Sequence, residues 1–182
     1  MRKVVASEFL TVDGVMEAPN QFTFSVGQSE EQLKFKFDEL FAADALLLGR
    51  KTYEGFAAAW PSVQGAGAYG ERMNTMPKHV FSRTLKTPEW NASFLTGSPA
   101  EEIAKLKKQD GQDLLIFGSG ALVQSLIAQD LIDEYRLMIF PLVAGSGRRL
   151  FPEGSAPKTL KLMDTKSFSS GVVVLIYQKA TE

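Results

Sequence analysis

A glycine and two cations follow an apolar run in the segment Leu46-Leu47-Leu48-Gly49-Arg50-Lys51-Thr52. If the run is a buried strand and a helix begins after it, free backbone N–H groups at the helix start favour an anion. Arg50 and Lys51 add full charges, and an arginine can hold a phosphate through two parallel hydrogen bonds. The pattern is typical of a phosphate site. The competing interpretation is a plain strand-to-helix turn with two solvated cations.

Two further strand ends carry residues of the same kind. One apolar strand is followed by the turn Gly118-Ser119-Gly120, after which Ala121 and Leu122 open a helical pattern. Another strand ends in Ser82 and Arg83. Three such strand ends predict one nucleotide bound across the carboxyl edge of a parallel sheet. The glycine turn is not the dinucleotide fingerprint, because it lacks the third glycine and the expected downstream acidic residue.

The elements that must position these residues alternate between strand and helix patterns, which favours a mainly parallel sheet with helices on its faces. Strands are predicted at 4–9, 45–48, 78–82, 114–117, 135–140, 160–163 and 172–177, and helices at 52–59 and 122–128, from Ser29 and from Ser98 to Gly111. Residues 62–77 show at most a short helix near 69–73. The helix from Ser29 is expected to bury Leu33, Phe37, Leu40 and Phe41. The last two strands are expected to add an antiparallel edge.

Composition limits the function classes. A chain of 182 residues with 45% hydrophobic residues is expected to fold as one domain over residues 1–182. A net charge of −1 gives no case for nucleic acid or an anionic membrane as a partner. The absence of cysteine excludes disulfides, thiol catalysis and cysteine metal sites, and no metal is expected. The amino terminus lacks a signal-peptide core and no apolar run reaches spanning length, so a cytoplasmic protein is expected.

In their order along the chain, these motifs resemble the dihydrofolate reductase-like superfamily. The closest branch contains the reductase domain of the bifunctional deaminase–reductase of riboflavin biosynthesis. The resemblance rests on Thr11-Val12-Asp13-Gly14-Val15 for the first loop, Gly49-Arg50-Lys51-Thr52-Tyr53 for the pyrophosphate turn, Ser82-Arg83-Thr84 for the adenosine-phosphate site, and Gly118-Ser119-Gly120, Asp133-Glu134, Pro141, Gly145-Ser146-Gly147 and Leu150-Phe151 for the carboxyl-terminal third.

The resemblance implies an α/β three-layer sandwich of the dihydrofolate reductase type and hydride transfer from NADPH to a small heterocyclic or conjugated C=N or C=O substrate. The implied cofactor-binding residues are Gly49, Arg50, Lys51, Thr52, Ser82, Arg83, Gly118, Ser119, Gly120, Ala121 and Leu122. The alternatives are 5-amino-6-(5-phosphoribosylamino)uracil reduction itself and a nucleotide-binding protein without turnover. Two departures stand out: relatives usually carry a glutamate where this chain has Phe117, and often a cis Gly–Gly peptide where it has Gly118-Ser119.

The substrate side offers two candidate catalytic carboxylates. Glu31 lies at the start of the first predicted helix, where family members place a carboxylate that polarises the substrate. Its alternative role is a carboxylate favoured by the helix dipole. Asp13 lies on the first loop, where it can bind substrate or brace the turn.

The resemblance also implies a homodimer that pairs through sheet-edge elements near the carboxyl terminus. The run of apolar residues at 172–177 is the candidate edge strand, because a bare apolar edge is an association hazard. The alternative is that this strand lies inside the sheet, with its neighbours covering it.

Overall fold

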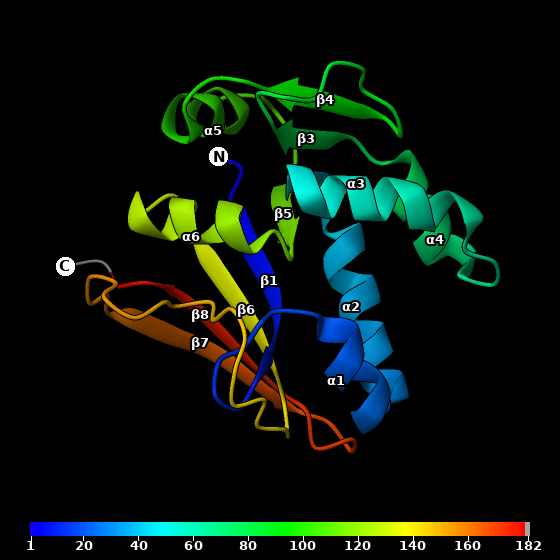
Figure 1. Cartoon of the computed structure of the whole chain (residues 1–182), viewed down its shortest axis with the longest axis vertical. Coiled ribbons are helices and arrows are strands. Elements are labelled where there is room, and N and C mark those ends of the chain that lie inside the picture. Colours follow the sequence, from blue (N-terminus) through cyan, green and yellow to red (C-terminus); the bar gives the residue numbers. More distant parts are fainter. Residues whose placement is uncertain (181–182) are drawn as a thin grey trace.

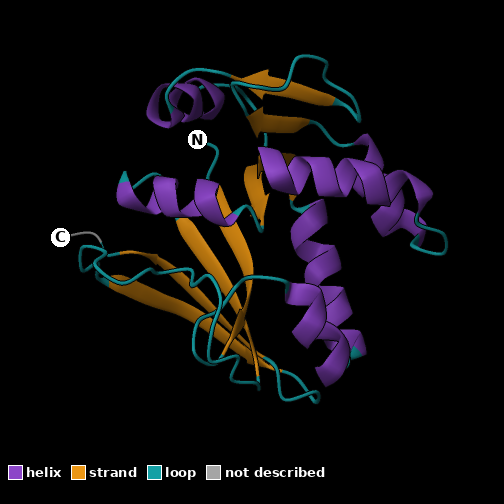
Figure 2. Ribbon diagram, in the orientation of Figure 1, coloured by secondary structure: helices purple, strands orange, loops and turns teal. Residues whose placement is uncertain are grey.

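The computed structural model describes residues 1–180, which form one eight-stranded sheet with helices on both faces (Figures 1 and 2). The strands are β1 (Val4–Thr11), β2 (Ala43–Gly49), β3 (Lys78–Phe81), β4 (Ala92–Leu95), β5 (Asp113–Phe117), β6 (Glu134–Phe140), β7 (Leu160–Ser167) and β8 (Val173–Lys179). The helices are α1 (Pro19–Val26), α2 (Glu30–Phe41), α3 (Arg50–Ala59), α4 (Gly67–Thr75), α5 (Pro99–Lys107) and α6 (Gly120–Ala128), with a 3-10 helix η1 (Trp60–Ser62) after α3.

The strand order is β4-β3-β2-β5-β1-β6-β8-β7. Strands β4 to β6 in this order are mutually parallel, while β8 runs antiparallel to both β6 and β7. The predicted fold class, a mainly parallel sheet with an antiparallel carboxyl-terminal part, is confirmed. Leu46, Leu47 and Leu48 are fully buried, as expected of a strand covered on both faces.

Helices α1 to α4 cover one face of the sheet, and α5 and α6 cover the other (Figure 1). Consecutive residues of β1 alternate between these layers: Val4 packs with α5 and α6, and Val5 packs with α2 and α4. The predicted apolar positions of α6 are all buried, namely Leu122, Val123, Leu126 and Ile127. This arrangement makes the three layers of the sandwich.

The sequence patterns missed two elements and misjudged one face. Helix α1 and strand β4 lie in segments without clear periodicity. In α2, only Leu40 of the predicted apolar stripe is buried, while Leu33, Phe37 and Phe41 are exposed. The helix instead turns Glu39 inward, because Lys36 on the same helix and Arg136 on β6 offset its charge.

The expectation that residues 172–177 form the edge strand is wrong. Strand β8 lies between β6 and β7, and β7 is the edge. The turn after β7 brings the chain back so that β8 pairs inside the sheet, and Val172 and Val174 are fully buried. Local hydrophobicity identified a strand but carried no information about the strand order.

Candidate active site

The helices that follow β2 and β5 leave the sheet on opposite faces. Helix α3 packs Tyr53 on the layer of α2 and α4, whereas α6 packs on the layer of α5. Because β2 and β5 are neighbours, the sheet opens between the two helix starts, at the carboxyl ends of the strands. Such a switch point is where open parallel sheets bind ligands.

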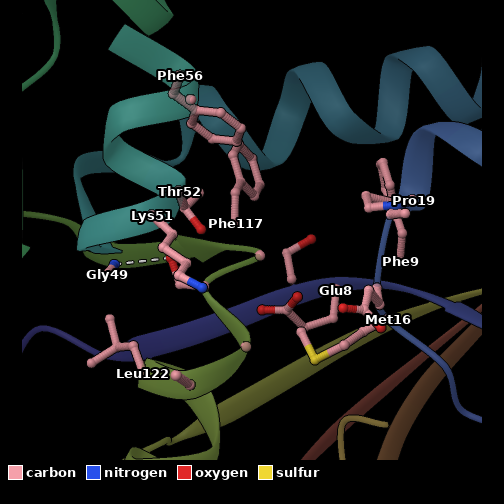
Figure 3. A pocket seen from close by; sticks show the side chains of 18 of the residues that line it. Glu8, Phe9, Met16, Pro19, Gly49, Lys51, Thr52, Phe56, Phe117 and Leu122 are labelled. Carbon is pink, nitrogen blue, oxygen red and sulfur yellow. Dashed lines mark hydrogen bonds between the residues drawn. The ribbon is translucent and has the colours of Figure 1, made fainter. Parts of the chain in front are cut away.

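A cavity of about 840 Å³ occupies this position (Figure 3). One part is bounded by the two strand-to-helix turns and the cations beside them. The other part is bounded by β1, α1, α2 and the aromatic residues that follow α3. The predicted cofactor residues that line the cavity are Gly49, Arg50, Lys51, Thr52, Gly118, Ser119, Gly120, Ala121 and Leu122.

A side-chain hydrogen bond joins the two turns. The backbone N–H of Gly49 donates to Ser119 Oγ at 2.9 Å. Gly49 and Ser119 are the N-caps of α3 and α6; Gly49 has no side chain, and the Ser119 side chain does not cap its own helix. The first N–H groups of both helices are therefore left for a ligand, and each helix adds the positive end of its dipole.

The glycine turn after β5 has an uncommon backbone. Gly118 and Ser119 have φ angles of 61° and 64°, so two consecutive residues are left-handed. The structure describes no cis peptide bond in residues 1–180, and the peptide between these two residues is trans. A left-handed serine costs of order 1 kcal/mol and persists only where its surroundings hold it. The hydrogen bond from Gly49 is such a constraint.

Three cations surround the helix starts. Arg50 lies 3.9 Å from Glu54, and both are half-exposed. Lys51 extends from the start of α3 into the cavity (Figure 3). Arg148 lies against the start of α6, where a Cβ on Gly120 would come 3.0 Å from Arg148 Cδ. This part of the cavity is suited to a diphosphate.

Ser82 and Arg83 do not line the cavity, although they end β3 at the same edge of the sheet. Ser82 is buried, and its Oγ accepts hydrogen bonds from the backbone N–H groups of Thr84 and Leu85. Its hydroxyl is thus engaged in the turn. Arg83 is exposed and lies two residues beyond Phe81, the residue of β3 that pairs with Gly49 at the end of β2.

The other part of the cavity is largely apolar. It is lined by Phe9, Met16, Phe56, Trp60, Tyr69, Met73 and Phe117. The Trp60 and Tyr69 rings lie 5.7 Å apart at their centroids. Flat side chains of this kind stack on planar ligands, so this part is suited to a heterocycle.

Glu8 is a cavity residue that sequence reasoning missed. It lies on β1 between Lys51 and Met16 (Figure 3), and the residue is 1% exposed. Its Oε1 is buried without a hydrogen-bond partner. Burial raises the pKa of Glu8 well above its ordinary value, and Glu39 raises it further, while Lys36 and the Gly118 N–H lower it. The sequence feature that could have identified Glu8 is a carboxylate within an otherwise largely apolar predicted strand.

Behind Glu8, charged residues of α2 form a buried network. Lys36 Nζ pairs with Glu39 and donates to Ser7 Oγ at 3.0 Å, and that hydroxyl donates to Glu39 at 2.9 Å. Lys36 Nζ also lies 4.1 Å from the ring centroid of Phe117. Arg136 approaches Glu39 at 3.7 Å. The lysine is thus held at the cavity wall by a carboxylate, a hydroxyl and an aromatic ring.

The two carboxylates proposed from sequence, Asp13 and Glu31, do not line the cavity. Asp13 accepts hydrogen bonds from Thr11 Oγ1 and from the N–H groups of Ala144 and Gly145, and these bonds lower its pKa to about 2. Glu31 is exposed at the start of α2, and hydrogen bonds there lower its pKa. Their predicted catalytic roles stay predictions, while their contacts brace a loop and a helix start.

In residues 1–180, no group of three histidine, cysteine or acidic residues is placed to hold a metal ion. The same residues include no helix long and apolar enough to cross a membrane.

Comparison with known proteins gives the family. Residues 2–174 match the RibD C-terminal domain. The chain is 32% identical over 180 residues to the uncharacterised protein YyaP of Bacillus subtilis, which covers 97% of this chain and 94% of YyaP. It is 26% identical over 177 residues to the uncharacterised protein YwjB of the same organism, covering 94% of this chain and 95% of YwjB.

Solved structures share the fold. A Shewanella sp. PV-4 protein named for riboflavin biosynthesis superposes with a TM-score of 0.81 over 98% of this chain and 99% of its own, at 18% identity. The Thermotoga maritima diaminohydroxyphosphoribosylaminopyrimidine deaminase/5-amino-6-(5-phosphoribosylamino)uracil reductase superposes with a TM-score of 0.65 over 98% of this chain and 57% of its own, also at 18% identity.

The chain belongs to the RibD C-terminal domain family, and the resemblance and fold expected from its motifs are confirmed. It is a reductase-like domain related to riboflavin biosynthesis.

Proposed function

We propose that this protein is an NADPH-dependent reductase that adds hydride to a small heterocyclic or conjugated C=N or C=O substrate. One observation supports this most directly. Two helix starts without side-chain caps, at Gly49 and Ser119, face one cavity that continues into an aromatic wall. A diphosphate and a planar ring are the two parts that such a cavity accommodates.

The residues present fit a nicotinamide nucleotide. The N–H groups at the starts of α3 and α6 would hold its diphosphate, and Arg50, Lys51 and Arg148 would neutralise the charge. Arg83, at the end of the neighbouring strand, would bind the additional phosphate that distinguishes NADPH from NADH. When bound, the nicotinamide supplies the hydride. The aromatic residues of the opposite wall exclude water and orient the acceptor.

The substrate part of the cavity favours an acceptor without a phosphate. The cation on this side, Lys36, is already engaged by Glu39, and Phe117 presents a ring next to it. Arg148 lies beside α6, at the end proposed for the diphosphate. These contacts weigh against a phosphoribosylated substrate and in favour of a compact neutral heterocycle.

Calorimetry with NADPH and NADH, followed by a panel of oxidised heterocycles and conjugated carbonyl compounds, tests this function. Loss of nicotinamide absorbance with an unphosphorylated acceptor is the expected result. Turnover confined to the phosphoribosylaminopyrimidine would instead assign the riboflavin-pathway reaction. Tight NADPH binding without turnover across the panel would indicate a nucleotide-binding protein, and absence of NADPH binding would overturn the proposal.

A further inference from the structure

Glu8 is an ionisable group that takes no part in the hydrogen bonds and ion pairs among Lys36, Glu39 and their partners. Lys36 is satisfied by Glu39 and Ser7, and Glu39 is approached by Arg136 as well. Glu8 faces the cavity from β1, is almost completely buried, and has one carboxyl oxygen without a partner. A buried polar atom without a partner costs of order 1–3 kcal/mol, so its retention calls for a role.

We propose that Glu8 is the catalytic acid of this site, giving its proton to a neutral acceptor whose reduction requires a proton together with the hydride. This inference rests on the proposed reductase function and narrows it. The substrate class becomes uncharged heterocycles and carbonyl compounds in which a ring nitrogen or an oxygen gains a hydrogen.

The groups around Glu8 explain how it holds a proton. Burial disfavours its carboxylate form, and the negative charge of Glu39 on α2 acts in the same direction. Lys36 on α2 and the Gly118 N–H at the end of β5 oppose them. Lys36 lowers the pKa of Glu8 more than Glu39 raises it, so the burial of the carboxyl decides the direction of the shift. The net result is a raised pKa, as general acids near neutral pH require.

The proton and the electron pair balance in one step. With NADPH bound, the cofactor would supply the hydride and be oxidised to NADP⁺; a C–H bond would form at the electrophilic carbon while the C=N or C=O π electrons move to the nitrogen or oxygen. The Glu8 O–H bond breaks, and its proton forms the new N–H or O–H bond. Glu8 is left as a carboxylate facing Lys36 and the Gly118 N–H. It takes a proton back from water when the product leaves.

The test uses two acceptors of one heterocycle: the neutral form, and its N-methylated cation, which accepts hydride without a proton. Glu8→Gln keeps the shape and the hydrogen-bonding capacity of a protonated carboxyl, so the fold and the NADPH dissociation constant should be preserved. The variant should lose about 100-fold or more of the wild-type kcat on the neutral acceptor. It should reduce the cationic acceptor at close to the wild-type rate.

Two measurements do not depend on turnover. Infrared difference spectroscopy near neutral pH should show a protonated carboxyl band in the wild type that is absent in Glu8→Gln. Circular dichroism and calorimetry with NADPH confirm that the variant is folded and binds. Glu134→Gln is the matched control, because Glu134 is also a buried carboxylate but lies at the start of β6, in ion pairs with Lys3 and Arg136. It should leave both rates and the infrared band unchanged.

Equal rates of wild type and Glu8→Gln on the neutral acceptor would overturn the assignment. An equal loss of kcat on both acceptors in Glu8→Gln would also overturn it, because that result marks a positioning residue. A loss of kcat on the neutral acceptor alone in Tyr69→Phe, and not in Glu8→Gln, would overturn it as well and would make the Tyr69 hydroxyl the proton donor. These outcomes leave the proposed reductase intact. Failure of the wild type to reduce any acceptor would overturn the reductase function and the role of Glu8 together.

Discussion

At the scale of single residues, the site uses its charges in two ways. Arg50, Lys51 and Arg148 lie near solvent at the helix starts, where positive charge attracts a ligand. Lys36 and Glu39 lie deep against β1 and neutralise each other. Charged residues thus face solvent at one end of the cavity and pair with each other at the other end.

Arg83 should decide between the two nicotinamide nucleotides. It is exposed, lies two residues beyond the end of β3, and adjoins the edge where the additional phosphate of NADPH is proposed to bind. A charge-assisted hydrogen bond contributes about 1.5–3 kcal/mol, so Arg83→Ala should weaken NADPH binding about tenfold or more and leave NADH unchanged. Calorimetry measures both, with the exposed Lys86→Ala as the control. Equal affinities of the wild type for NADPH and NADH would contradict the prediction.

Gly118 should be essential for cofactor binding but not for folding. The nearest protein atoms to a Cβ at this position belong to Thr52, at 3.9 Å, so a valine side chain has room in the folded protein. It would, however, fill the part of the cavity where the cofactor is proposed to bind. The φ of 61° at this position adds backbone strain of about 1–2 kcal/mol. Gly118→Val should therefore fold yet lose NADPH binding by calorimetry.

The control for that strain is Gly65→Val. Gly65 has a φ of 76°, has open space around it, and does not line the cavity. It should show the same loss of thermal stability with unchanged NADPH binding. Normal NADPH binding by folded Gly118→Val would place the cofactor elsewhere.

At the scale of elements, the sequence predicted most of what local pattern determines. The strands with continuous apolar runs, the caps at Ser29 and Ser98, and the buried face of α6 are all present. Nine of the eleven predicted cofactor residues line one cavity, because carboxyl ends of parallel strands must meet at one edge.

What the sequence could not supply was the partner of each side chain. The partly buried Lys36 and the buried Glu39 have the charged sequence pattern of a solvated helix face. They are tolerated against the sheet because β1 and β6 present Ser7 and Arg136 to them. Glu8 was overlooked for the same reason. Strand β8 was misplaced because strand order depends on long-range pairing that no local window contains.

Lys78 on β3 should make the free energy of unfolding depend on pH in the alkaline range. It is fully buried, donates to the Asn74 carbonyl, and lies over Trp90, and burial lowers its pKa to about 8. Between pH 8 and about 10.4 the unfolded chain binds more protons at this site than the folded chain does. The free energy of unfolding should therefore rise with pH in this window.

Lys78→Met should remove this rise in the free energy of unfolding, which should amount to about 1–3 kcal/mol across the window. The measurement is urea unfolding of both proteins from pH 7 to 10.5, read as the difference between them so that tyrosine titration cancels. A difference that does not change with pH would show that Lys78 keeps its ordinary pKa.

At the scale of the whole molecule, the sheet ends in two edge strands, β4 and β7. Strand β7 is exposed along nearly its whole length, and Leu162 and Met163 are about half-exposed. A long bare edge of this kind favours pairing with another chain. We therefore expect a homodimer that buries β7, the most common arrangement being a symmetric pair.

Light scattering at micromolar concentration should give a mass near twice 20.0 kDa. Leu162→Lys on β7 should convert it to a monomer, whereas Val143→Lys, at an exposed apolar residue of a loop, should not. A 20.0 kDa wild-type species would reject the dimer. Dissociation by Phe37→Lys instead would place the interface on the exposed ring stack of Phe37 and Phe41 on α2.

The hydrogen bond between Gly49 and Ser119 joins positions 70 residues apart in the chain. Neither the amino-terminal part, with its glycine and cations, nor the later turn contains the whole of the proposed nucleotide site by itself. The binding surface comes into existence only when β2 and β5 have paired, which is a late, long-range event in the assembly of such a sheet. We therefore expect that a newly made chain takes up nucleotide only after its central strands have paired. From then on, bound nucleotide opposes their separation.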